Sequence, residues 1–319
     1  MISVSLLIAL LADRLLGEAP RCHPLVGFGR VANWVEFRAC RLMRAGSEMR
    51  GVEPDISPST QRCLGTLSWG LLIIPPTVLM WFLLGIVSGF SATILSIAVL
   101  YFCVGGRSLF EHASAVATPL ERGDLASARA QLSRIVSRDT AQLDAESVAK
   151  ATVESVLENG SDALLAPIFW FVVAGAPGVL CYRLANTLDA MWGYRNPRFL
   201  NYGRTAARMD DVLNWVPARC CALSYAVVGQ WRSALRCWHT QAAQCDSPNA
   251  GPVMSAGAGS LGILLGGTAS YENVSHWRPI LGEGLPVEPD DIGRALVLLR
   301  RATGLWIVVI IVFEFLLWI

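Results

Sequence analysis

The sequence is poor in charge for its length. Charged residues make up 16% of the 319 residues, hydrophobic residues make up 53%, and the mean hydropathy is +0.45. Soluble domains carry about 25% charged residues, so the composition excludes an ordinary cytosolic enzyme and a disordered chain. The net charge of +1 supplies no basic field for nucleic acid, and we expect no nucleic-acid partner.

The sequence also lacks the short motifs of several common enzyme classes. Lys150 is the only lysine, so no Walker A loop, which needs a Gly-Lys pair, is present. The nine cysteines and four histidines form neither a Cys-x-x-Cys pair nor an HExxH motif, and no Gly-x-Ser-x-Gly elbow occurs. A disulfide scaffold, a structural zinc site and a serine hydrolase are therefore disfavoured, and we expect reduced, buried thiols.

Long apolar stretches predict an integral membrane protein. Residues 63–106 contain no charged side chain and no histidine. Because about 20 apolar residues cross a bilayer, this stretch predicts a hairpin of two crossings that turns near 88–91. Residues 302–319 predict a C-terminal span, with Trp306 and Trp318 as anchors at the membrane interface.

The distribution of arginine predicts the orientation of the chain. Arginines are frequent in 1–62 and 107–162 and absent from the turn at 88–91, so both flanks of the hairpin are expected to face the cytoplasm. Residues 183–246 are also arginine-rich, and a single crossing at 163–182 cannot satisfy both assignments. That segment contains Pro167, Gly175, Pro177 and Gly178, which favours a broken or re-entrant helix covered by protein.

These observations predict an all-α, polytopic protein of the cell (inner) membrane, with a cytoplasmic-facing helical portion that carries the active site. Residues 1–319 are expected to form a single domain with the hairpin at 63–106, a polar region at 107–251 and the C-terminal span at 302–319. The uncharged stretch 247–271 is built largely of small residues, which suit close packing of backbones or the approach of a ligand.

The densest polar cluster precedes the broken helix. Asp144 can cap a helix over 145–158, on which Glu154 and Glu158 lie one turn apart and face the same way. Gly160 favours an end of that helix. Asp162 would extend the row of Glu154 and Glu158 only if the helix continued past Gly160.

A solvated acidic face is the ordinary interpretation of such a row. Here the row leads directly into the apolar segment that begins at Ala163, where ionisable groups are costly. We therefore favour an acidic site that binds Mg²⁺.

A second polar set follows the broken helix. Arg183, Asn186 and Asp189 can share one helix face. Downstream, a second polar set combines acids, an amide and arginines: Arg204, Arg208, Asp210, Asp211, Asn214 and Arg219. Pro217 precedes Arg219, so we expect Arg219 to lie after the end of that helix. Salt bridges within the helices would explain part of the pattern, but carboxylates beside arginines also suit a metal and a nucleotide.

His23 is the remaining candidate. It is followed by Pro24 and the Gly27-Phe28-Gly29 sequence, which does not complete a dinucleotide-binding pattern. An isolated histidine is more often structural than catalytic.

Several strings in the sequence resemble the CobD/CbiB family, and the resemblance covers nearly the whole chain. They are HPLVGFGR at 23–30, SRDT at 137–140, ATVESVLENGSDALLAPIFW at 151–170, GAPG at 175–178, NTLDAMWGY at 186–194, GRTAARMDDVLNWVPAR at 203–219 and SPNAG at 247–251. Two positions depart from the family pattern. Pro252 stands where a histidine is frequent, and Ala163 stands where a glycine is usual.

The resemblance implies an adenosylcobinamide-phosphate synthase, a membrane enzyme of cobalamin biosynthesis. Its corrinoid substrate is adenosylcobyric acid, whose free propionate is joined to aminopropanol or its O-phosphate in an amide bond, with ATP and Mg²⁺ required. A homo-oligomer or a complex with later enzymes of the pathway is left open. Two rivals remain, a non-enzymatic membrane regulator of the AmpE type and a small-molecule transporter.

On this basis the candidate residues receive hypothetical roles. Glu154, Glu158 and His23 are assigned to catalysis, with His23 as a base for the amine. Metal binding is assigned to Asp139, Glu154, Glu158, Asp162, Asp189, Asp210 and Asp211. Phosphate, carboxylate or substrate binding is assigned to Arg138, Arg183, Arg208, Arg219, Asn159, Asn186 and Asn214, and the corrin ring is expected against the glycine-rich stretch 251–267.

Overall fold

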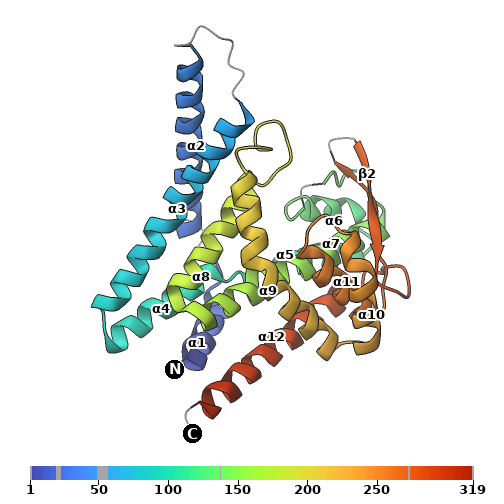
Figure 1. Cartoon of the computed structure of the whole chain (residues 1–319). Helices are drawn as coiled ribbons and strands as arrows, with labels where there is room; N and C mark the ends of the chain where they lie inside the picture. Colours follow the sequence, from blue (N-terminus) through green and yellow to red (C-terminus); the bar gives the residue numbers. More distant parts are fainter. Residues whose placement is uncertain (1, 19–22, 49–56, 137, 272–273, 318–319) are drawn as a thin grey trace. The chain divides into compact units, whose positions relative to one another are not determined.

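A computed structural model describes residues 2–18, 23–48, 57–136, 138–271 and 274–317. Helices dominate the described residues, which confirms the expected helical class, and a short antiparallel hairpin is added to them (Figure 1). Trp318, expected at the membrane interface, and Ser137, part of the SRDT string, lie outside these ranges. The chain divides into two compact units. Unit 1 comprises 1–17, 105–166 and 214–319, and unit 2 comprises 18–104 and 167–213.

Unit 1 is formed by helices from both ends of the chain and by the hairpin. Its elements are α1 (Ile2–Leu16), α5 (Gly106–Glu121), α6 (Leu125–Leu132), α7 (Ala145–Gly160), the π-helical turn η1 (Ser161–Leu165), the second part of α9 (Arg204–Val228), α10 (Trp231–Gln241), the 3₁₀ turn η2 (Ala242–Gln244), α11 (Ala250–Leu261), β1 (Leu265–Tyr271), β2 (Val274–Leu281) and α12 (Asp291–Leu316). Figure 1 shows β2, α10 and α11 together on one side of this unit.

The small residues of α11 serve close packing, one of the two uses expected of this stretch. Every residue of α11 from Gly251 to Leu261 is buried. A Cβ added at Gly257 would lie 2.7 Å from the side chain of Leu157 in α7, and one added at Gly259 would lie 2.9 Å from the Ala234 backbone in α10. Glycine is therefore required for α11 to fit between its neighbours.

Unit 2 is formed by α2 (Pro24–Glu48), α3 (Pro58–Ile86), α4 (Gly89–Cys103), α8 (Ala166–Trp192) and the first part of α9. Figure 1 shows α2 and α3 running side by side. Their core is closed by large side chains of α8 and the loop that follows it, and includes Ile73, Leu188, Trp192 and Tyr202.

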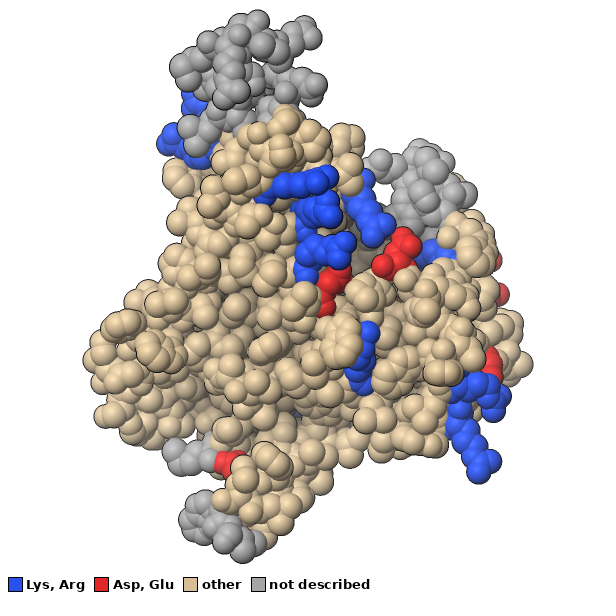
Figure 2. Space-filling model, viewed as in Figure 1, with Lys and Arg blue, Asp and Glu red and all other residues tan. Residues whose placement is uncertain are grey.

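Among the described residues, four helical stretches are long and apolar enough to cross a membrane: Pro58–Ile86, Gly89–Glu121, Ala145–Trp192 and Asp291–Leu316. The first two confirm the expected hairpin, with the turn at Val87 and Ser88. Figure 2 shows a broad surface without charged side chains over α3 and α4. Trp81, Phe82 and Ile86 of α3 and Phe90 of α4 are exposed apolar residues, as expected for contact with lipid.

The helix expected to be broken is broken. Within α8 the backbone leaves helical geometry at Ala174 (φ −135°, ψ 15°) and at Gly175 (φ 63°, ψ −156°). Glycine adopts a positive φ without strain, whereas other residues rarely do. The break therefore separates the apolar start of α8 from the polar face that carries Arg183 and Asn186.

The fold predicts that Gly65→Ala destabilises unit 2. A Cβ at Gly65 would lie 1.9 Å from the carbonyl oxygen of Tyr202, and backbone cannot yield as a flexible side chain can. We expect a loss of about 1–3 kcal/mol, measured as a lower unfolding midpoint in detergent. Gly85→Ala in the same helix is the matched control, because an added Cβ there meets nothing within 4 Å. Equal midpoints for the two variants would contradict the proposed packing.

Candidate functional site

The described residues contain a buried carboxylate held by two arginines in unit 1. Glu154 in α7 is 3% exposed. It accepts a short hydrogen bond from Arg138, two bonds of 2.9 Å from Nη2 of Arg278, and one of 3.0 Å from the backbone N–H of Gly266. A buried charge is stable when it is paired and hydrogen-bonded in this way, so Glu154 fixes both guanidinium groups.

Three separate segments of the sequence bring these groups together. The helix that carries Glu154 begins after Asp144, whose side chain accepts from the N–H of Ser147 at 2.8 Å, as the sequence predicted. Arg278 lies on β2, where it pairs with Gly267 of β1. The register of the hairpin shifts between Leu265 and Gly267, and this irregularity turns the Gly266 N–H toward Glu154.

A cavity of about 180 Å³ opens beside this ion cluster. It is lined by Arg138, Glu154, Ser155, Glu158, Asn159, Met254 and Arg278, among others. Glu158 lies one turn after Glu154 on α7, as predicted, but it is exposed and makes no hydrogen bond or ion pair with any described residue. The Nε of Arg278 is buried and has no partner in the part of the chain that the structure describes. Arg278, which carries this donor, and the carboxylate of Glu158 therefore belong to the lining of one cavity.

The other acids predicted for unit 1 lie apart from this cavity. Asp139 is exposed and accepts from the backbone N–H of Ala141 at 2.9 Å. Asp162 belongs to the π-helical turn η1, where its charge acts on Tyr225 and Cys221. Neither residue lines the cavity beside Glu154, so the predicted four-acid row is not a single ligand set.

Arg219 lies inside α9, which corrects the prediction that the helix ends near Pro217. Proline removes the hydrogen bond to the carbonyl of residue 213, and that carbonyl instead accepts from Nε1 of Trp170 at 3.0 Å. Arg219 stacks over the ring of Trp215 at 4.1 Å and donates to Oδ1 of Asn249 at 3.3 Å. Burial lowers the pKa of Arg219 from its ordinary value.

Asn214, also in α9, is only 2% exposed and does not line the cavity beside Glu154. It takes part in interactions within the fold. The substrate-binding role assigned to Asn214 stays a prediction.

In unit 2 the predicted face of α8 forms a hydrogen-bonded chain. Nη1 of Arg183 donates to Oδ1 of Asn186 at 3.3 Å, and Nδ2 of Asn186 donates to Oδ1 of Asp210 at 3.3 Å. The Nε of Arg183 is buried and, within the described ranges, has no partner. The structure therefore brings together residues of two helix faces that the sequence had predicted separately, and Arg183 retains an unused donor.

The acidic side chains of unit 2 lie close enough for their charges to act on one another. Asp189 lies within reach of the charges of Asp210 and Asp211. Burial raises the pKa of Asp211, and the positive charges of Arg208 and Arg195 oppose that rise. Such a set would accept a cation, yet the described residues contain no group of three or more His, Cys, Asp or Glu side chains placed to hold a metal ion.

This result limits the expected role of Mg²⁺. Both oxygens of Glu154 already accept from cationic donors or from the Gly266 N–H, so Glu154 does not fit as a metal ligand. Mg²⁺ commonly binds through one or two carboxylates together with substrate phosphates. In unit 1, Glu158 is the cavity carboxylate that fits such a partial site.

His23 serves the start of α2. Its Nδ1 accepts from the backbone N–H of Leu25 at 3.3 Å, and its ring packs edge-on against Phe102 with centroids 5.7 Å apart. Burial lowers the pKa of His23 below its ordinary value of 6.5, an effect that the charge of Glu18 opposes and that of Arg183 reinforces. The neutral imidazole is required for this cap, which supports the structural interpretation.

Sequence reasoning missed Arg278 and the pair formed by Glu36 and Arg198, and it did not predict the bond from the Gly266 N–H to Glu154. Glu36 is 4% exposed and accepts from Nε and Nη2 of Arg198 at 3.0 and 2.7 Å. A carboxylate within a largely apolar segment was the available signal for this pair. Arg278 gave no comparable signal, because its partner is 124 positions away in the sequence.

The chain is similar to cobalamin biosynthesis proteins. The family described as CobD/Cbib protein matches residues 6–299. Cobalamin biosynthesis protein CobD of Stutzerimonas stutzeri is 52% identical over 97% of this chain and 96% of its own length. The proteins of that name from Chromobacterium violaceum and Mycobacterium tuberculosis are 51% and 36% identical, covering 94% and 93% of this chain and 92% and 91% of their own lengths. No solved structure matches the chain.

Glu154→Gln should destabilise unit 1 and loosen both arginines. The change leaves the guanidinium groups of Arg138 and of the half-buried Arg278 without their counter-charge, and breaking such a buried pair costs about 3–5 kcal/mol. The measurement is the unfolding midpoint in detergent, with Glu146→Gln in the same helix as control. Glu146 forms a half-exposed pair with Lys150 at 3.2 Å, and losing it should cost less than about 1 kcal/mol. A midpoint for Glu154→Gln as high as that of the control would contradict the assigned role.

His23 should make stability depend on pH. Because its pKa in the fold lies below 6.5, the unfolded chain binds the proton first, and stability is lost as pH falls from about 6.5 through the folded pKa. We expect the midpoint to fall between about pH 7.5 and about pH 5.5, and His23→Gln to reduce that fall. The same pH dependence in both proteins would exclude His23 as its source.

Proposed function

Since the chain belongs to the CobD/CbiB family and acts in cobalamin biosynthesis, we propose that it catalyses ATP-dependent formation of an amide bond. The acid is the free propionate of adenosylcobyric acid, and the amine is aminopropanol or its O-phosphate. The product is adenosylcobinamide or its phosphate, which makes the protein an adenosylcobinamide-phosphate synthase.

The chemistry requires activation of the propionate, because a carboxylate is a poor electrophile. A carboxylate oxygen attacks the γ-phosphorus of ATP, ADP leaves, and an acyl phosphate forms. The amine nitrogen then attacks the carbonyl carbon, the C–O bond to phosphate breaks, and inorganic phosphate leaves while the nitrogen loses a proton. Charge develops on phosphate oxygens in both steps, so fixed cationic donors lower both barriers.

The observation that carries the proposal is a cavity lined by two arginines, Arg138 and Arg278, that are already fixed by Glu154. A guanidinium that is pre-oriented by a buried carboxylate loses little entropy when it binds a second oxyanion. A volume of about 180 Å³ suits a phosphate or a propionate group and excludes a corrin ring. The ring is therefore expected to remain outside while its side chain enters.

Glu158 and Asn159 complete the proposed site. Asn159 donates to the backbone oxygen and to Oγ of Ser155 at 3.0 and 3.1 Å, which leaves its side-chain oxygen for an amine or hydroxyl. Glu158 is the free carboxylate, suited to take the proton of the amine or to hold Mg²⁺ together with phosphates. Mg²⁺ would supply neutralisation of the phosphate charge. His23 is left out of this site because its Nδ1 caps α2.

We also propose that the cavity faces the cytoplasm of the cell (inner) membrane. Arginines flank the hairpin of α3 and α4 and are absent from its turn, which favours cytoplasmic flanks by the positive-inside rule. ATP and the corrinoid substrate are supplied on that side. The expected partners are therefore the bilayer, the corrinoid and the aminopropanol substrate.

The test is ATP-dependent amide formation by the purified full chain in nanodiscs, followed by mass spectrometry of the corrinoid. Arg278→Ala should lower turnover by about 10²-fold, the usual effect of losing one oxyanion donor. Arg236→Ala is the control, because Arg236 lies 64% exposed in a surface pair with Glu283. ATP consumption without amide formation, or formation without ATP, would contradict the proposal and favour a regulator or a transporter.

Glu158→Gln distinguishes the two roles of Glu158. Turnover should fall by about 10²-fold or more if Glu158 accepts the proton. A fall that excess Mg²⁺ restores identifies a metal ligand, whereas a fall that Mg²⁺ does not restore identifies a proton acceptor. Unchanged turnover at all Mg²⁺ concentrations would remove Glu158 from the site.

A further inference from the structure

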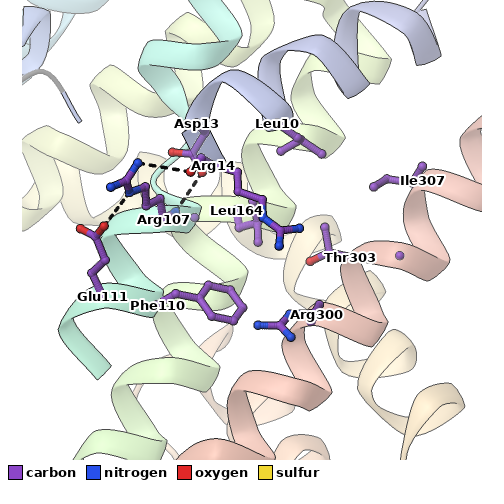
Figure 3. Close-up of a pocket in the computed structure, with 12 residues that line it drawn as sticks. Leu10, Asp13, Arg14, Arg107, Phe110, Glu111, Leu164, Arg300, Thr303 and Ile307 are labelled. Carbon is purple, nitrogen blue, oxygen red and sulfur yellow. Dashed lines mark hydrogen bonds and ion pairs between the residues drawn. The ribbon is translucent and has the colours of Figure 1, made fainter. Parts of the chain in front are cut away.

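A second, larger cavity lies in unit 1 where three helices meet. Its volume is about 420 Å³, and it is lined by the end of α1, the start of α5 and the middle of α12. Figure 3 shows Leu10, Leu164 and Ile307 on its apolar side, and Arg14 and Arg300 extending into the same space. Apolar and cationic groups therefore line one hollow.

This cavity lies at the level where the helices change from apolar to charged. Helices α1 and α12 run antiparallel, since the backbone N–H groups of Ile2 and Ser3 donate to Glu314 at 2.9 and 2.8 Å. The apolar first part of α1 thus packs along the apolar second part of α12, and Arg14 lies toward Arg300. Charged side chains beside the ends of apolar helix segments are typical of the surface of a bilayer.

The acids of the cavity are already engaged by Arg107. The backbone N–H of Arg107 donates to Asp13 at 2.9 Å, and its Nε donates to Glu111 at 2.5 Å. Its Nη1 donates to the carbonyl oxygens of Leu15 and Arg14 at 2.8 and 3.3 Å, which caps the end of α1. Arg107 therefore serves the fold rather than a ligand.

Arg14 and Arg300 have no such engagement. Neither side chain forms an ion pair with any described residue, and both are exposed. The guanidinium of Arg300 lies over the ring of Phe110, 5.2 Å from its centroid, which holds it at the cavity. Two cations that face one space repel each other, and an anion between them removes that repulsion.

We propose that this cavity binds an anionic phospholipid, with its phosphate between Arg14 and Arg300 and its acyl chains along α1 and α12. The arginine forks match a phosphate oxygen pair. The adjoining helix surface is apolar and exposed at Leu7, Leu11 and Val308, so acyl chains that leave the cavity stay in contact with apolar side chains. A free phosphate would use the arginines and leave the apolar side unoccupied.

Gly304 provides space for the acyl chains. It lines the cavity, and a Cβ added there meets no atom within 4 Å. A larger side chain at this position would fill the apolar side of the cavity without displacing the backbone. The two parts of the proposed site can therefore be tested separately.

The test uses the purified full chain in detergent and lipids with identical acyl chains. Dioleoyl phosphatidylglycerol should raise the Tm and remain bound in native mass spectrometry, whereas dioleoyl phosphatidylcholine and inorganic phosphate should do neither. In the double variant Arg14→Gln, Arg300→Gln, retention of the anionic lipid should fall about tenfold or more. Gly304→Leu should also reduce retention, although both arginines remain.

The matched control is the double variant Arg122→Gln, Arg301→Gln, which removes the same charge. Arg122 lies at the end of α5, and Arg301 lies on α12. Both are exposed, and neither lines this cavity. It should retain the lipid as the wild type does. The proposal is overturned if the two double variants lose lipid equally, if both lipids raise the Tm equally, or if inorganic phosphate reproduces the effect. The Tm without lipid should be the same in all variants, and a lower value for the Arg14 and Arg300 variant would assign those residues to folding instead.

Discussion

The polar part of unit 1 depends on one buried charge, the carboxylate of Glu154. A lone carboxylate at 3% exposure would cost several kcal/mol. Two guanidinium groups and one backbone N–H remove that penalty, and each of these donors comes from a different segment. The loop before α7, the start of β1 and the middle of β2 are thus held against one helix by a single side chain.

The same interaction determines which neighbouring groups remain available to a ligand. Both carboxylate oxygens of Glu154 already accept hydrogen bonds. Glu154 therefore orients Arg138 and Arg278 and is not placed to bind a metal. Glu158 lies one turn later and faces the cavity without a partner in the described residues. An anion holder and a free carboxylate are the two elements that the proposed acyl activation and amine attack require. Adjacent turns of α7 organise both, because Glu154 holds Arg138 and Arg278 from other segments and Glu158 is the carboxylate.

Much of the fold follows from patterns that are local in sequence. The uncharged stretch 63–106 predicted α3 and α4, and Asp144 predicted the start of α7. Gly175 and its neighbours predicted the break in α8, because breaking a helix needs only local geometry. The interior of α9 was misjudged at Pro217 because a distant residue, Trp170, satisfies the freed carbonyl. Local propensity cannot reveal such compensation.

The arrangement on α7 follows from local pattern for the same reason. Glu154 and Glu158 share one helix at a spacing of four, so spacing alone placed them on one side, whereas Asn159 was assigned through the family resemblance. Arg278 was missed because its position depends on the pairing of β1 with β2 and on a shift in register, and the glycine-rich β1 shows little of the alternation typical of strands. The family resemblance supplied the reaction, which spacing could not.

The separation of Glu154 from Arg278 also constrains how the protein is made. The two residues are 124 positions apart, and a ribosome adds about 5–20 residues per second. For roughly ten seconds the nascent chain carries Glu154 without its second guanidinium, in the second half of a helix that leads into an apolar stretch. During that interval Glu154 must stay hydrated at the membrane surface or keep its proton, and the arrival of the hairpin is the event that allows the acid to be buried as an ion.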